Sequence, residues 1–251
     1  MDRSSRDKFR FFLKDIVRQT INFYNTDQNR GIEPPPIEKP FSPGAKRIDL
    51  IPAAELHDIS AVDVFTAINN RRSRRVFKPV ALTHRELSFL VWATQGIRKK
   101  AGPGTAFRTV PSAGCRHSLE TYVCVLNVEG LEEGMYRYLP VEHQLLLVSQ
   151  PAQLSSRVSE AALGQEFIGK AAVTFIWTAI PYRMEWRYDL AAHKVIALDA
   201  GHACQNLYIS CEAIHAGTCA VAAYHQELMD SLLGVDGTEE FTLYLAPVGK
   251  V

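Results

Sequence analysis

The sequence predicts an α+β domain built on a mixed β-sheet. Residues 122–126 and 171–180 are apolar runs of strand length, which are typical of strands covered on both faces. Segments with helical spacing of apolar residues alternate with these runs only loosely. The regular alternation of strands and helices that indicates a parallel α/β sheet is missing. Buried strands among irregularly placed helices therefore favour the α+β class.

The composition narrows the class of protein further. The 251 residues are 47% hydrophobic, and 28 Lys and Arg residues offset 27 Asp and Glu residues to a net charge of +1. Such values are typical of a globular protein and argue against general nucleic-acid binding, which needs a basic excess. No uncharged apolar run approaches the roughly 20 residues of a membrane span, and the charged amino terminus does not resemble a signal peptide. With an odd number of cysteines, five, the protein is expected to be cytoplasmic with reduced thiols.

The first 58 residues differ from the rest of the chain. Apolar side chains at helical spacing predict one amphipathic helix over residues 7–24. Six of the 13 prolines follow between residues 34 and 52, and their spacing favours polyproline and turn conformations over strands and helices. We therefore interpret residues 1–58 as an arm that wraps the main body, and residues 59–251 as one domain.

Regular elements follow in the main domain. A short helix is predicted over residues 63–70. Thr83 and Glu86 have the spacing of a capping box, which predicts that a second helix begins there. Asp199 is predicted to cap a long helix that continues to about Ala216. The remaining segments are expected to form a strand pair at 135–139 and 145–148, a helix at 151–164 and a final strand at 241–247.

The densest cluster of charge is Arg71-Arg72-Ser73-Arg74-Arg75, directly after the first short helix. Guanidinium groups together with a hydroxyl suit a phosphate, because they combine bidentate charged donors with a neutral donor. A run of arginines is more often only a solvated charged turn, so this alternative stays open. A nucleic-acid patch is less favoured, because no aromatic residues that could stack on bases interleave the arginines.

Three further segments carry residues that could line a ligand. Pro111-Ser112-Ala113-Gly114 combines small residues with a hydroxyl at a turn, so the backbone could approach a flat ligand closely. Trp186-Arg187-Tyr188 precedes a helix rich in polar groups, and buried helices rarely carry such groups unless they are paired or catalytic. Residues 217–223 are mostly small, and their backbone N–H groups could face a ligand. Taken singly, the first segment could be a tight loop and the last a buried strand.

Histidines and cysteines are concentrated between residues 202 and 219. Cys211 and His215 are four residues apart on one predicted helix face, a spacing that zinc can use. No paired Cys-x-x-Cys motif accompanies them, and buried cysteines commonly serve as small apolar residues. The sequence therefore predicts no metal site. Gly102-Pro103-Gly104 also lacks the register of a dinucleotide-binding loop, which argues against a permanent NAD site.

These segments occur in the order found in a known family. Arg71-Arg72-Ser73-x-Arg75 resembles the opening motif of the nitroreductase-like flavoproteins, and the later motifs resemble the SagB-type dehydrogenase branch. The resemblance covers about residues 60–250, and its strength lies in the ordered combination because each motif alone is weak. The motifs of the branch are residues 111–114 followed by Leu119-Glu120, residues 134–138, Leu198-Asp199-Ala200-Gly201-His202 with Gln205-Asn206, and residues 245–249.

The resemblance implies a fold, a cofactor and a set of binding residues. The implied fold is a mainly antiparallel sheet surrounded by helices, in a homodimer that binds FMN at the subunit interface. The phosphate and ribityl chain would contact Arg71, Arg72, Ser73 and Arg75, with Lys250 as a second phosphate contact. Along the isoalloxazine of the other subunit would lie Pro111, Ser112, Ala113 and Gly114. Backbone N–H groups on the flavin N5 side would come from Ala220, Val221, Ala222 and Ala223.

Two departures from the branch concern the reaction. Azoline-oxidising members have a Lys-Tyr pair after a Trp, whereas this chain has Arg187-Tyr188 after Trp186. Arginine stays charged and cannot abstract a proton, while Tyr188 could donate or shuttle one. Residues 115–118 also differ from the branch, which indicates a changed substrate side of the pocket. The catalytic candidates are Tyr188 and Arg187.

The predicted function is FMN-dependent oxidoreduction, in which hydride moves between the flavin N5 and a small organic or peptide-derived substrate. NAD(P)H is expected only as a transient electron donor that docks over the flavin. Two alternatives stay open: an NAD(P)H-dependent reductase of nitro or quinone acceptors, and a flavin-binding scaffold subunit with little catalysis. The expected partners are a second copy of the chain and the substrate, without nucleic acid or membrane.

Overall fold

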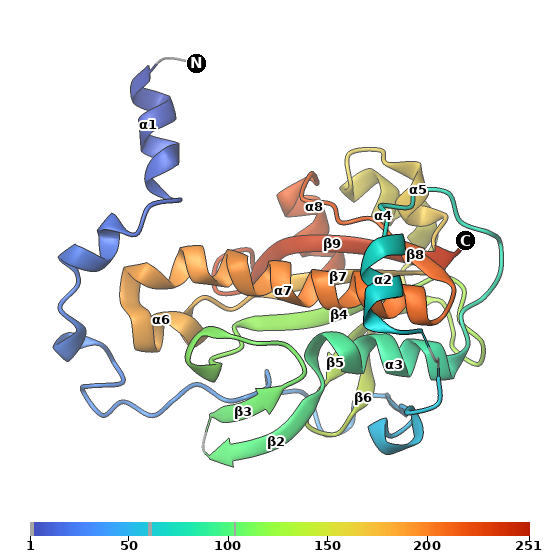
Figure 1. Ribbon diagram of the computed structural model, residues 1–251, viewed down its shortest axis with the longest axis horizontal. Coiled ribbons are helices and arrows are strands. Elements are labelled where there is room, and N and C mark those ends of the chain that lie inside the picture. The colour runs from blue at the N-terminus through green and yellow to red at the C-terminus, as the bar shows by residue number, and fades with distance from the viewer. Residues whose placement is uncertain (1–2, 60–61, 103) are drawn as a thin grey trace.

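The computed structural model describes residues 3–59, 62–102 and 104–251, which contain a seven-stranded sheet (Figure 1). Every neighbouring pair of strands in this sheet is antiparallel. This confirms the α+β class with a mainly antiparallel sheet. Across the sheet the order is β1 (Arg47–Asp49), β6 (Gln144–Ser149), β5 (Gly134–Leu139), β4 (Leu119–Val125), β7 (Val173–Ala179), β9 (Phe241–Lys250) and β8 (Ala216–Thr218).

The two apolar runs of the sequence form neighbouring strands at the centre of this sheet. All residues of β4 and β7 are buried, and the strands pair from Leu119 opposite Ala179 to Val125 opposite Val173. Side chains alternate between the two faces of a strand, so complete burial requires that both faces of the sheet be covered. The apolar runs therefore predicted both the strands and their cover on both faces.

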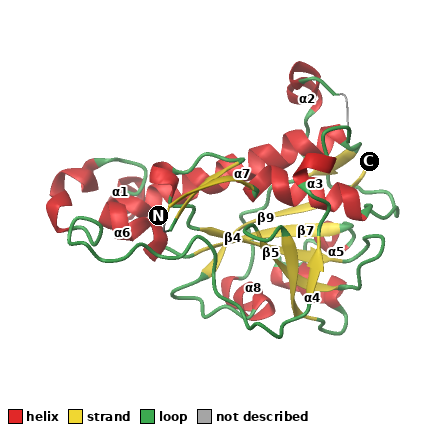
Figure 2. Ribbon diagram, turned by 90° about the horizontal axis from the view of Figure 1, so that it is seen from below, coloured by secondary structure: helices red, strands yellow, loops and turns green. Residues whose placement is uncertain are grey.

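Helices supply that cover on both faces of the sheet (Figure 2). A larger hydrophobic core lies between the sheet and two long helices, and a second core lies under three shorter helices on the opposite face. The two long helices are α3 (His84–Gln95) and α7 (Ala192–Ala213), and the shorter ones are α4 (Leu154–Ala161), α5 (Glu166–Gly169) and α8 (Gln226–Leu233).

Two predicted helix starts are confirmed. Asp63 caps α2 (Val64–Asn70), since its Oδ1 accepts a hydrogen bond from Thr66 N at 2.9 Å. Before α3, Thr83 Oγ1 accepts from Glu86 N at 3.1 Å, and Glu86 Oε2 accepts from Thr83 N at 2.9 Å. Both halves of the capping box are present. The first cap also places α2 directly before the arginine cluster.

The prediction of one helix over residues 7–24 is wrong. The chain instead forms α1 (Arg3–Phe11), which projects away from the body, followed by 3₁₀ turns at Ile16–Thr20 and Phe23–Asn25 (Figure 1). Phe9 and Leu13 remain 70% and 68% exposed. Burial of an apolar face is what stabilises most protein helices. Because these side chains stay open to solvent, one continuous helix is not held together.

The predicted start and end of the long helix are also wrong. α7 begins at Ala192 and ends at Ala213, and Asp199 is buried within the helix, where it caps nothing. The helix starts early because α6 (Tyr182–Tyr188) and a 3₁₀ turn lead directly into it. It ends early because His215 has a φ of 52°, a left-handed conformation that helices do not tolerate, and β8 begins at the next residue.

The arm formed by residues 1–58, called the wrap from here on, contains regular structure that was not predicted from its prolines. β1 pairs with β6 at the edge of the sheet, and Ala53–Glu55 forms a 3₁₀ turn. The hairpin of β2 (Ile97–Gly102) and β3 (Thr105–Arg108) was also missed. Most residues of β2 are exposed, so this strand lacks the apolar pattern by which the buried strands were found.

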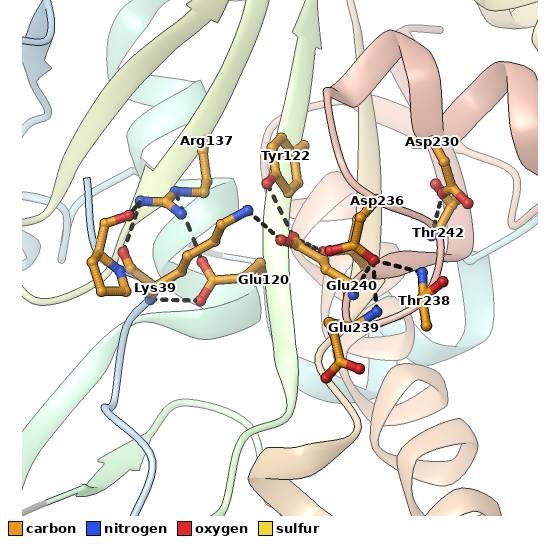
Figure 3. Close-up of polar contacts among 12 residues, drawn as sticks. Lys39, Glu120, Tyr122, Arg137, Asp230, Asp236, Thr238, Glu239, Glu240 and Thr242 are labelled. Atoms are coloured by element: carbon orange, nitrogen blue, oxygen red, sulfur yellow. Dashed lines mark hydrogen bonds and ion pairs between the residues drawn. The ribbon is translucent and has the colours of Figure 1, made fainter. Parts of the chain in front are cut away.

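A buried charge network fastens the wrap to the sheet (Figure 3). One oxygen of Glu120 accepts from Lys39 N at 3.0 Å and from an Arg183 Nη at 2.5 Å. Arg137 lies 4.0 Å from the other oxygen and donates to Lys39 O at 2.8 Å. The Lys39 ammonium forms an ion pair with Glu240. The side chains of Glu120, Arg137 and Arg183 are only 3% exposed, so this network is part of the interior.

Candidate active site

The arginine cluster lies beside β8, so two segments far apart in the sequence meet where α2 crosses the end of α7 (Figure 1). Ser73 forms a parallel bridge with Thr218, and Arg74 N donates to Thr218 O at 2.9 Å. Gly217 permits this approach, because a Cβ there would lie 2.4 Å from the Arg74 side chain. The predicted phosphate-binding cluster and the small-residue segment 217–223 therefore lie side by side.

Tyr208, on α7, connects these two segments. Its hydroxyl lies 2.9 Å from Ser73 Oγ and accepts a hydrogen bond from Ala220 N at 2.8 Å. The Arg71 guanidinium carbon lies 5.2 Å from the centre of the Tyr208 ring, a cation–π distance. Tyr208 was not singled out from the sequence, where its signal is that it follows the polar pair Gln205-Asn206 on one helix.

The donors of the arginine cluster are not used by other side chains. Among the described residues, none of Arg71, Arg72 and Arg75 forms an ion pair, and the last two are exposed. Arg74 Nε and Thr218 Oγ1 are buried without a hydrogen-bond partner. Buried polar atoms are normally paired, so these two atoms beside free guanidinium groups indicate the place of an anion. The residues present fit the phosphate of FMN.

Only part of the small-residue segment keeps free backbone donors. Ala220 N donates to Tyr208, and Val221 N donates to a carbonyl of β9 at 2.8 Å. Within the part of the chain that the structure describes, Ala222 N and Ala223 N have no acceptor, and both residues are exposed. A ligand edge that needs backbone donors would therefore meet Ala222 and Ala223.

Lys250 lies opposite Ala216 at the end of β9, but its charge is already paired. Its Nζ forms an ion pair with Glu86 and donates to Ile214 O at 2.7 Å. The predicted second phosphate contact would therefore require the ion pair with Glu86 to open.

A second cluster forms around Gly114. Its φ is 58°, and a Cβ there would lie 2.7 Å from the Tyr188 hydroxyl and 2.8 Å from Arg187 Nε. Glycine is therefore needed both for the left-handed backbone and for the close approach. The loop Pro111–Gly114 and the triplet at 186–188, which the sequence presents as separate features, are in contact.

Asp199 supports this loop from α7. Burial raises the pKa of Asp199, while the neighbouring Ser112 side chain, His202 and the Ala113 backbone act against the rise. His202 Nδ1 lies 3.8 Å from Asp199 Oδ1, with about half of the imidazole side chain exposed. Ser112 Oγ in turn accepts from His117 N at 2.9 Å. Asp199 therefore holds the loop in place and is not a helix cap.

The two clusters face different sides of α7. Asp199 contacts the Gly114 cluster and Tyr208 contacts the arginine cluster, nine positions further on (208 − 199). At about 1.5 Å and 100° per residue, nine positions correspond to about 13 Å along the helix axis and half a turn around it. In Figure 1, α6, which ends at Tyr188, lies at one end of α7, and α2, which directly precedes the arginine cluster, crosses the other end.

The histidines and cysteines of residues 202–219, all within the described ranges, form no metal-binding group. Within the described ranges, no three His, Cys, Asp or Glu side chains are grouped in a way that could hold a metal ion. Burial raises the pKa of the Cys204 thiol to about 12 and also raises that of Cys211.

None of the helices in the described ranges combines the length and the apolar character that crossing a membrane requires.

Comparison with known proteins places these features in a family. Over 196 residues the chain is 33% identical to a Methanocaldococcus jannaschii protein named "putative nitroreductase", a match covering 78% of this chain and 95% of that protein. It is also 26% identical over 133 residues to the trifolitoxin-processing protein of Rhizobium leguminosarum bv. trifolii. That match covers 51% of this chain and only 36% of the relative.

A solved structure, that of a "putative nitroreductase" from Ralstonia eutropha, has the same fold. The TM-score is 0.67 at 22% identity, with 87% of this chain and 94% of that chain covered. Residues 68–250 match the nitroreductase family as a whole. On this match and on the identity to the Methanocaldococcus protein, the chain belongs to the nitroreductase family.

Proposed function

We propose that the chain is an FMN-dependent oxidoreductase that moves hydride between the flavin N5 and a small organic or peptide-derived substrate. The observation that carries the proposal is the set of unpaired guanidinium groups at Arg71, Arg72 and Arg75 beside the buried, unpartnered Arg74 Nε and Thr218 Oγ1. A phosphate is the kind of anion that such guanidinium and hydroxyl donors bind. When bound there, FMN supplies the hydride chemistry that no side chain can perform.

The chain's own residues would fix the cofactor at several points. Ser73 adds a neutral donor to the guanidinium groups, and Tyr208 holds Ser73 and Ala220 at fixed positions by its two contacts of 2.9 and 2.8 Å. The free N–H groups of Ala222 and Ala223 supply further donors. Preorganised donors of this kind stabilise charge that develops during a reaction without reorganising themselves.

A second copy of the chain would complete the site. Because the arginine and Gly114 clusters face different sides of α7, the loop Pro111–Gly114 of one copy would serve the cofactor held by the other. α2 carries an apolar surface for such a contact, with Val64, Phe65 and Ile68 exposed by 69%, 79% and 59%. Large exposed apolar side chains that lie together mark interaction surfaces.

The ordered motifs favour the SagB-type dehydrogenase branch within the family. The identity to a protein named for trifolitoxin processing favours a processing reaction over the reduction of a nitro or quinone acceptor. Arg187 cannot act as the base that a lysine would provide, so Tyr188 is the candidate for proton transfer. Both side chains lie against Gly114, which places them at one point of the site.

NAD(P)H-driven reduction of a nitro or quinone acceptor is the second candidate, favoured by the 33% identity to a protein named as a nitroreductase. An absorbance spectrum followed by anaerobic stopped-flow mixing with NADH and NADPH tests both. We expect flavin bands in the purified protein, and rapid bleaching by NAD(P)H would select the reductase. Flavin that bleaches with dithionite but passes electrons to no acceptor would indicate a scaffold subunit. A colourless protein that FMN does not reconstitute would falsify the proposal.

Replacing Tyr188 with phenylalanine should slow turnover and leave flavin content unchanged. The hydroxyl is lost while the ring stays in place, and general acid–base catalysis contributes about 100-fold or more to such reactions. We expect kcat to fall about 10- to 100-fold in steady-state assays. Tyr182→Phe is the matched control, because Tyr182 lies on the same helix but bonds to Asp27 at 2.8 Å. Equal rates for the two variants would exclude a proton role for Tyr188.

A further inference from the structure

Two arginines next to the Gly114 cluster have no carboxylate partner. Arg116 is 5% exposed, and its guanidinium carbon lies 4.6 Å from the centre of the Trp186 ring. Arg187, the residue after that tryptophan, is half-buried and has its Nε beside Gly114. In the described part of the chain, neither side chain forms an ion pair. The two cations therefore lie close together without a counter-charge.

The surroundings increase this imbalance. Burial, and then the nearby charges of Arg187 and Arg183, lower the pKa of Arg116. Two carboxylates, those of Glu120 and Glu185, have other partners: Glu120 binds Arg183 at 2.5 Å, and Glu185 lies 2.7 Å from His193 Nε2. Arginine does not lose its proton in proteins, so burying such a pair without an anion is unfavourable.

The hydrogen bonds made by the two arginines hold their side chains but leave donors free. Arg116 Nε donates to Arg183 O at 3.1 Å, and among the described residues its two Nη atoms have no acceptor. Arg187 Nη1 donates to Gln28 Oε1 at 3.2 Å, and Gln28 N donates to Trp186 O at 2.9 Å. The wrap thus orients Arg187. Planar guanidinium groups with free N–H donors match the geometry of a carboxylate.

We propose that Arg116 and Arg187 form a subsite that binds a carboxylate of the substrate. Gly114 is exposed and lies against Arg187, which is itself half-buried, so an anion can reach Arg187 from the solvent. This subsite rests on the proposed function, because it names the class of substrate for that reaction. The substrate would be a carboxylate-bearing molecule whose reacting group lies near Tyr188. We assign the phosphate of FMN to the separate arginine cluster at residues 71–75, so the pair Arg116 and Arg187 is not needed for that phosphate.

The binding test compares benzoate with benzamide, which differ in charge but hardly in shape. Isothermal titration calorimetry of the purified protein should show tighter binding of benzoate. Arg116→Gln and Arg187→Gln should each weaken benzoate binding about 10- to 100-fold and leave benzamide unchanged, because each removes a charge-assisted contact. Arg157→Gln, an exposed arginine on α4, is the matched control and should change neither. Equal affinity of the wild-type protein for both probes would overturn the subsite.

The turnover test uses 4-nitrobenzoate and 4-nitrobenzamide with NADH or NADPH as donor. The carboxylate is remote from the nitro group, so the two arginine variants should raise KM for the acid more than KM for the amide, and the preference for the acid in kcat/KM should fall. If the variants instead raise KM for NADPH and keep the preference for the acid, the pair binds the phosphates of the nicotinamide donor and the proposal is wrong.

These results separate the two proposals. Preference for benzoate that depends on Arg116 and Arg187, in a protein that never binds FMN, would support the subsite and remove the proposed function. Flavin-dependent turnover without any preference for the carboxylate would do the reverse. Since Arg116 is buried and its replacement could unfold the chain, circular dichroism is recorded for each variant, and the half-buried Arg187 decides the outcome if Arg116→Gln is unfolded.

Discussion

Replacing Arg71 and Ser73 together with alanine is expected to release FMN from a protein that remains folded. The double variant loses one charge-assisted contact and one neutral hydrogen bond to the phosphate, which together correspond to about a 100-fold loss of affinity or more. Arg71 is partly exposed and Ser73 is exposed, so the double variant removes no fully buried side chain. Flavin content by absorbance and FMN titration by fluorescence measure the loss, and circular dichroism reports the fold.

A matched pair of residues provides the control for this experiment. Ser156 and Arg157 are both exposed on α4, and their replacement with alanine removes the same side-chain types without changing flavin content. If the first double variant is unfolded, Arg72→Gln with Arg75→Gln tests the same cluster, because both side chains are exposed. Full flavin content in folded variants of the cluster would show that the phosphate binds elsewhere.

Replacing Glu120 with glutamine should destabilise the protein by about 3 kcal/mol or more, because removal of one partner leaves buried charges uncompensated. Glu120 pairs with Arg183 at 2.5 Å and faces Arg137 at 4.0 Å. It also accepts from Lys39 N, so the wrap would loosen from the sheet (Figure 3). Urea unfolding at pH 7 measures the loss in the free energy of unfolding.

An exposed ion pair serves as the control for Glu120. Glu166 and Lys170 are more than two-thirds exposed and lie four residues apart on the surface. Surface pairs of this kind contribute roughly 0.5 kcal/mol or less, so Glu166→Gln should hardly change the unfolding midpoint. A loss for Glu120→Gln no larger than that for Glu166→Gln would mean that the network does not fasten the wrap.

The cost of Glu120→Gln should depend on pH. Burial acts to raise the pKa of Glu120, but Arg183 and Arg137 outweigh it, so the pKa lies below the ordinary 4.5. Stability that comes from this carboxylate is therefore present above pH 4.5 and is lost as the pH falls toward the lowered value. The difference between wild type and variant should shrink below pH 4.5. Glu38 acts in the opposite sense: burial raises its pKa to about 7, so the stability that it contributes is lost as the pH rises from 4.5 toward 7.

Local sequence signals predicted the elements whose causes are local. The capping box of Thr83 and Glu86 joins residues three positions apart, so its geometry follows from the spacing alone. Buried strands such as β4 and β7 show their burial as continuous apolar runs. The long-helix boundary at Asp199 failed because a buried aspartate in a helix has the same sequence signature as a cap.

The elements at the surface and at the sheet edge could not be predicted from such local sequence signals. β2 is mostly exposed and carries no apolar pattern, and the helix expected over residues 7–24 had the pattern but not the surface to bury it. An apolar stripe shows which side chains a helix could bury. Whether another element of the fold packs against that stripe depends on the tertiary structure.

By itself the sequence determined the α+β class, the central strands and the segments that carry candidate site chemistry. Only the tertiary structure decided which of those segments meet. Ser73 and Tyr208 are 135 residues apart and bond at 2.9 Å, while Lys250 is paired with Glu86 across 164 residues. Gly114 touches Tyr188, and Arg116 lies beside Arg187 without a carboxylate. The physical reason is that charge pairing and close approach depend on distance in space, which a pattern along the chain does not contain.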